Sequence, residues 1–70
     1  IIYPNPAGDV LTIESVIPLI RVEIYSVTGI KIMDIQSDFD AIPVKSLSEG
    51  GYMLKGENEY GSITRKFSKQ

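Results

Sequence analysis

Residues 20–35 read IRVEIYSVTGIKIMDI and carry the clearest secondary-structure pattern in the chain. The first half alternates apolar and polar side chains, which is typical of a β-strand with one buried face. Thr28-Gly29 then predicts a tight turn, because glycine accepts a positive φ without steric cost. The stretch is therefore expected to form a β-hairpin. One face of its first arm would carry Ile20, Val22 and Ile24, and the other Arg21, Glu23 and Tyr25.

The second arm of this hairpin, Ile30–Ile35, has apolar residues on both faces. That pattern predicts a strand that is covered on both sides. Farther along, Ala41–Lys45 is short and contains Pro43, which cannot donate a hydrogen bond to a neighbouring strand. We therefore expect this segment at a sheet edge or at a bulge.

Three more segments, Val10–Glu14, Gly51–Gly56 and Ser62–Ser68, alternate with the same period of two residues. The side chains that share a face in them are Leu11 and Ile13, Tyr52 and Leu54, and Ile63, Arg65 and Phe67, respectively.

Turn-forming residues separate all of these strands, at Pro4–Asp9, Ile17-Pro18, Gly50-Gly51 and Glu57–Gly61. Short strands at intervals of roughly 8–12 residues, with turns between them, indicate a β-sandwich. No internal repeat or linker is visible. The sequence therefore predicts one all-β domain over residues 1–70, an antiparallel β-sandwich of about six to seven short strands.

Composition excludes several classes of function. The net charge of −2 argues against nucleic-acid binding, which needs a basic surface. No apolar run is long enough for a transmembrane segment. The chain contains neither Cys nor His, so thiol chemistry and the commonest general base are missing. We therefore expect no cofactor and no catalytic residues, and the protein is predicted not to be an enzyme.

Asp38 and Asp40 are two carboxylates close together in the sequence that could suggest a calcium site. Two carboxylates are few for Ca²⁺, which takes six to eight oxygen ligands. A solvated loop is the better interpretation, and no metal site is predicted.

Four blocks, in this order, resemble the type A C-terminal sorting domains of the type IX (Por) secretion system of Bacteroidetes. The opening YPNP, residues 3–6, precedes DVLTI at 9–13, and VEIYSVTGIKI at 22–32 is similar to the family's hairpin. LSEGGYML at 47–54 and TRKFSKQ at 64–70 resemble its last two motifs. Ser26, Ser48 and Gly51 stand where the family more often has Asp, Pro and a β-branched residue, respectively.

The resemblance implies an Ig-like β-sandwich and a secretion signal that directs a cargo protein through the periplasm and across the outer membrane. It implies as partners the type IX translocon, a sortase-like peptidase and an upstream cargo domain. Subsequent cleavage and attachment to the cell surface, or release into the medium, would follow. Because the chain starts with Ile1 instead of Met, we expect a fragment of a larger secreted protein. The cargo's identity is not readable from these residues.

The resemblance also points to residues that the translocon would recognise: Gly50, Tyr52, Arg65, Lys66 and Lys69. Three of the seven basic residues fall in the last six positions. They could form a docking strip, or they could protect a solvated edge strand from aggregation. Gly50 and Tyr52 have a competing structural role, with the tyrosine ring packed inward and its hydroxyl bonded to backbone. Structural roles are also expected for Tyr3, Pro4, Asn5, Pro6 and Gly29.

Two alternatives stay open. One is a non-catalytic accessory module, adhesive or carbohydrate-binding, on an extracellular enzyme. The chain has no Trp and six aromatic residues, several of them in strands, so exposed stacking platforms for sugars are scarce. The other is a homodimer formed through strand edges or through the apolar Ile1-Ile2 start.

Overall fold

Seven β-strands and no helix occur in the residues that this computed structural model describes, 1–4 and 6–70. The predicted all-β class and strand number are confirmed. The strands are β1 (Ile2–Tyr3), β2 (Val10–Ile13), β3 (Arg21–Ser26), β4 (Lys31–Ile35), β5 (Ile42–Pro43), β6 (Gly50–Asn58) and β7 (Gly61–Lys69).

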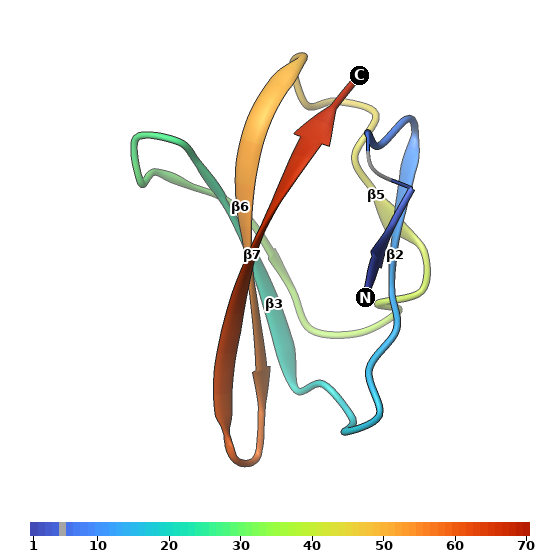
Figure 1. Cartoon of the computed structure of the whole chain (residues 1–70), viewed down its shortest axis with the longest axis vertical. Helices are drawn as coiled ribbons and strands as arrows, with labels where there is room; N and C mark the ends of the chain where they lie inside the picture. The colour runs from blue at the N-terminus through green and yellow to red at the C-terminus, as the bar shows by residue number, and fades with distance from the viewer. Residues whose placement is uncertain (5) are drawn as a thin grey trace.

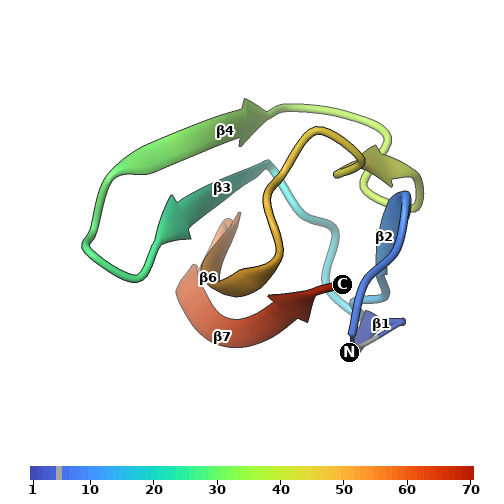
Figure 2. The ribbon, with the colours of Figure 1, turned by 90° about the horizontal axis from the view of Figure 1, so that it is seen from above.

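The strands form two antiparallel sheets that face each other (Figure 1). The smaller sheet has the order β1-β2-β5, and the larger has the order β4-β3-β6-β7. Figure 2 shows β4 and β7 at opposite edges of the larger sheet. The chain crosses between the sheets three times, so neither sheet is complete without both halves of the sequence.

Apolar side chains from both sheets fill the space between them. Leu11 and Ile42 come from the smaller sheet, and Val22, Ile24 and Leu54 come from the larger one. Full burial of one such side chain contributes roughly 1.5–3 kcal/mol to the free energy of unfolding. The remaining buried apolar residues are Ala7, Val44, Leu47, Tyr52 and Phe67.

The predicted hairpin between β3 and β4 is confirmed. The Gly29 backbone N–H donates to the Ser26 carbonyl at 3.0 Å, and the Ser26 N–H donates to the Ile30 carbonyl at 2.9 Å. Gly29 has a φ of 90°. This is the positive backbone angle that the turn was expected to need and that glycine adopts without steric cost. Ile20 differs from the expectation, since it lies before β3 and its side chain is 59% exposed.

The prediction that the second arm is covered on both sides is wrong. Strand β4 is an edge strand, and Ile30 and Ile32 are 66% and 42% exposed. The strands of the smaller sheet are only two to four residues long, and in the described residues no further sheet or helix packs on the outer face of the larger sheet. A register shift opposite Ile24 and Tyr25 further turns β4 relative to β3.

The other segments follow their patterns with adjusted bounds. Pro43 lies in β5 at the edge of the smaller sheet, as its missing N–H predicted. The expected loop at 57–61 is shorter, because Asn58 pairs with Gly61 and only two residues remain between the strands. Strand β7 alternates as predicted, but among Ile63, Arg65 and Phe67 only Phe67 is buried.

Candidate recognition surface along the last strand

Strand β7 is held on one side by β6 over its whole length, from the Asn58–Gly61 pair to the Gly50–Lys69 pair. In residues 1–4 and 6–70, its other edge is covered only near its end. There the Ala7 N–H donates to the Ser68 carbonyl at 2.7 Å, and the Gln70 N–H donates to the Ala7 carbonyl at 2.9 Å. The opening loop and the last strand are therefore joined by a short parallel bridge.

The described residues of the YPNP motif precede this bridge in the sequence. Tyr3 is the last residue of β1 and pairs with Thr12 of β2, and Pro4 and Pro6 are exposed. Asn5 lies outside the described residues. Ala7, directly after the motif, is fully buried against the end of β7. The sequence did not reveal this pairing, because no local pattern links residues more than 60 positions apart.

The three basic residues of β7 do not share one face of the sheet. Arg65 pairs with Leu54 and Lys66 with Met53, and adjacent strand residues point to opposite faces. Lys69 falls on the same face as Arg65 by this alternation. A single basic strip is therefore absent, and the cations instead flank the edge of β7 from two sides.

Tyr52 has the geometry that the structural interpretation predicted. Its side chain is 9% exposed, and its hydroxyl donates to the Ser48 carbonyl at 2.7 Å. Its ring stacks on Phe67 of β7, with centroids 5.6 Å apart and an angle of 24° between the planes. Gly50 begins the same strand with a φ of 140°, which favours glycine. Tyr52 therefore packs against Phe67 of β7, and Gly50 allows the backbone conformation at which β6 begins.

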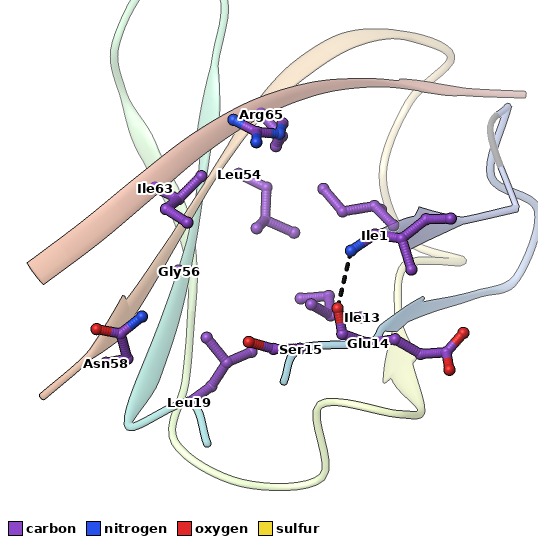
Figure 3. A pocket seen from close by; sticks show the side chains of 11 residues that line it. Ile1, Ile13, Glu14, Ser15, Leu19, Leu54, Gly56, Asn58, Ile63 and Arg65 are labelled. Carbon is purple, nitrogen blue, oxygen red and sulfur yellow. Dashed lines mark hydrogen bonds between the residues drawn. The ribbon is translucent and has the colours of Figure 1, made fainter. Parts of the chain in front are cut away.

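A groove of about 100 Å³ opens beside the uncovered part of β7 (Figure 3). Leu54 and Leu19 lie in it, and Ile63 and Arg65 of β7 stand along one side. On the opposite side, the Ile1 backbone nitrogen donates to the Glu14 carbonyl at 2.8 Å, which fixes the start of the chain beside β2. The remaining lining residues are Ile2, Ile13, Ser15, Gly56 and Asn58.

Among the described residues that line this groove, Arg65 has the only basic side chain and Glu14 the only acidic one, and the Ile1 ammonium group is a second cation. The Arg65 guanidinium donates to the carbonyl of its neighbour Thr64 at 3.2 Å. Among the described residues it forms no ion pair, whereas Arg21, Lys31 and Lys55 all contact carboxylates. The groove thus combines apolar walls with the Arg65 cation, which forms no ion pair in the described part of the chain although Glu14 also lines the groove.

The outer face of the larger sheet holds an ion-pair cluster that the sequence analysis missed. Arg21 forms a bidentate pair with Asp34, and the Lys31 ammonium lies 2.9 Å from both Glu23 and Asp34. Hydrogen bonds from Arg21 and then Lys31 lower the pKa of Asp34 to about 2. The hydrogen bond from Lys31 likewise lowers the pKa of Glu23.

Glu23 is buried in this cluster, with 6% of the residue exposed, although it occupies an outward position of β3. Burial, followed by its hydrogen bond to Glu23, raises the pKa of the neighbouring Tyr25. Counting outward from a turn at Thr28-Gly29 pairs Glu23 with Asp34, and this pair is observed. The register shift that brings Lys31 to the same face has no sequence signal.

Asp38 and Asp40 are both exposed, and the Asp40 carbonyl accepts a hydrogen bond from the Thr12 hydroxyl at 2.9 Å. Throughout residues 1–4 and 6–70, no three side chains of the metal-binding types gather. In the same residues, no helix has the length and apolar content needed to cross a membrane.

A family model described as "Secretion system C-terminal sorting domain" matches residues 1–70. No curated protein and no solved structure matches the chain.

Proposed function

The chain belongs to the family of secretion system C-terminal sorting domains, and we propose on this basis that the edge of β7 is the surface that the secretion machinery recognises. Domains of this family are sorting signals for type IX secretion. They mark proteins for export to the cell surface or the extracellular space and interact with the type IX machinery. The family is not catalytic.

One observation carries the assignment of β7. Its basic side chains Arg65 and Lys66 flank the part of the edge that the described residues leave uncovered, and Lys69 lies at the bridge to Ala7, although the chain as a whole is acidic. Exposed cations at a strand edge can attract an acidic partner surface and fix its register. Gly50 and Tyr52 act in this proposal through folding, because they position β6 and the Phe67 ring beneath β7.

The 70 residues act in this proposal as one non-catalytic module of a larger secreted protein, whose cargo carries the biochemical activity. Cleavage by a sortase-like peptidase and attachment of the cargo to the cell surface would follow export. Support for this part comes from family membership, which covers the whole length of the sequence.

A reporter fusion tests sorting directly. Residues 1–70 would follow an exported fluorescent protein in a Bacteroidetes host, with and without a working type IX translocon. We expect reporter at the surface or in the medium only when the translocon works. Reporter that stays in the periplasm of both strains, attached to a folded domain, would contradict sorting by this chain.

Two paired substitutions test the role of the basic residues. Lys66→Ala with Lys69→Ala removes two cations at β7, and we expect export to fall while the melting curve of the domain is unchanged. Lys45→Ala with Ser46→Asp alters the net charge by the same two units at exposed positions in the turn between β5 and β6, away from β7, and should leave export intact. Equal losses from both pairs would assign the effect to net charge instead of to a docking surface.

A further inference from the structure

The two edges of the larger sheet differ in how open they are to another strand. At β4, the register shift opposite Ile24 and Tyr25 disturbs the ladder, and Lys31 and Asp34 are already held in the ion-pair cluster. Bulges and charged side chains are the usual means by which edge strands avoid pairing with other chains. The β4 edge is therefore protected against strand addition.

The backbone of β7 has the opposite character. Ser68 and Gln70 direct their hydrogen-bonding groups away from β6, as their bonds to Ala7 show. In an antiparallel ladder this direction repeats every second residue, so Ser62, Thr64 and Lys66 face the same way. No backbone group in the described residues bonds to those three. At this edge the Thr64 carbonyl accepts a hydrogen bond from the Arg65 side chain instead of from the backbone of a neighbouring strand.

The side chains beside this edge specify what kind of strand would fit. Ile63 and Ile1 are 51% and 80% exposed on the two sides of the groove, and buried Leu54 lies between them (Figure 3). Arg65 adds a cation without a carboxylate partner in the described residues. An added strand would place alternate side chains into this groove, because strand side chains alternate between faces.

We propose that the β7 edge from Ser62 to Lys66 accepts an extended segment of a partner protein as a fifth strand of the larger sheet. The segment carries apolar side chains that cover Ile63 and Leu54, and a carboxylate that pairs with Arg65. Its backbone bonds to Thr64, and the segment ends where Ala7 already occupies the edge. The proposal rests on the recognition role of β7 and names how the partner binds.

Proline at position 64 is the sharpest probe. Thr64→Pro removes an N–H that faces the open edge but none of the bonds between β6 and β7, and proline is tolerated in edge strands where its missing N–H faces solvent. We expect secretion of the reporter fusion to fall roughly tenfold, the change that loss of about one well-formed hydrogen bond produces. Thr64→Val keeps the N–H and the branched shape, and should be secreted normally.

Arg65→Glu provides a second test that leaves the β7 backbone intact. It should lower secretion through repulsion of the partner's carboxylate, whereas Arg65→Lys should retain most of it. Urea unfolding of each purified variant checks that the domain remains folded. Normal secretion of both Thr64→Pro and Arg65→Glu would overturn strand addition, while failure of the unaltered fusion to be secreted would instead contradict the sorting function.

A second copy of the chain is the competing occupant of the edge. Sedimentation of the purified chain distinguishes it, since a monomer is expected for both the unaltered protein and Thr64→Pro. A dimer that Thr64→Pro dissociates would assign the edge to self-association and overturn the proposal.

Discussion

Tyr52 joins the two long strands through a single side chain, because its ring stacks on Phe67 while its hydroxyl bonds the Ser48 carbonyl at 2.7 Å. Tyr52→Phe keeps the ring contact and removes only the hydroxyl. We expect the free energy of unfolding to fall by about 1 kcal/mol, the typical net value of one hydrogen bond. Urea denaturation measures it, with Tyr60→Phe as the control, because Tyr60 is 78% exposed. An unchanged midpoint for Tyr52→Phe would show that its hydroxyl bond adds no stability.

Gly50 and Gly8 form a matched pair for testing backbone strain. A Cβ atom at either position would meet no atom within 4 Å, but only Gly50 has a positive φ, 140°. Gly50→Ala should therefore lower the free energy of unfolding by about 1 kcal/mol or more, whereas Gly8→Ala should leave it equal or slightly higher. Thermal melting of the two variants compares them. Equal melting temperatures would contradict a strained role for Gly50.

Asp34 makes the stability of the domain depend on pH in a defined direction. Its pKa is lowered to about 2 in the folded protein, below the value of about 3.9 for a free aspartate. The resulting stabilisation is present in full above the unfolded pKa and is lost as the pH falls through about 2. We expect the difference in urea midpoint between the unaltered chain and Asp34→Asn to be constant near neutral pH and to shrink below pH ~4. A difference that stays constant down to pH ~2 would contradict the ion-pair account.

At the scale of the element, β7 is bound to β6 along one edge, and in the described residues its other edge is open from Ser62 to Lys66. Amide hydrogen exchange should therefore alternate along it, with Ile63, Arg65 and Phe67 protected by β6. Ser62, Thr64 and Lys66 should exchange fast in the isolated domain, because their N–H groups face the open edge. NMR-detected exchange measures each amide. Uniform protection along β7 would show that the edge is already occupied.

Across the whole molecule, the opening loop closes the sandwich by pairing with the end of β7. Ala7 is fully buried at this junction, so Ala7→Asp would place a charge without a partner in the interior. We expect a loss of roughly 3 kcal/mol or more, a large fraction of what a domain of this size possesses. Gly8→Asp is the control, since Gly8 is exposed and has open space around it. Similar urea midpoints for the two variants would contradict closure at Ala7.

Local patterns in the amino-acid sequence were sufficient for the strands and the main turn. The alternation in β3 and the glycine at 29 reflect a backbone period and a φ value that involve only neighbouring residues, and both are observed. The inward packing of Tyr52 beside Gly50 followed from the same kind of local reasoning. The order of the four motifs identified the family, and the family model covers all 70 residues.

Pairing between distant segments had no such local signal, and here the tertiary structure was required. Ile30 and Ile32 are exposed because β4 became an edge strand, and an apolar pattern does not tell which strands lie at an edge. Arg65 and Lys66 lie on opposite faces of β7, and only the packing of the two sheets shows which face borders the groove. Ala7 meets Ser68 and Gln70 because both ends of the chain pack at one edge of the same sandwich. Strand periodicity is a property of neighbouring residues, whereas edges, faces and the open side of β7 arise only when two sheets bury a shared core.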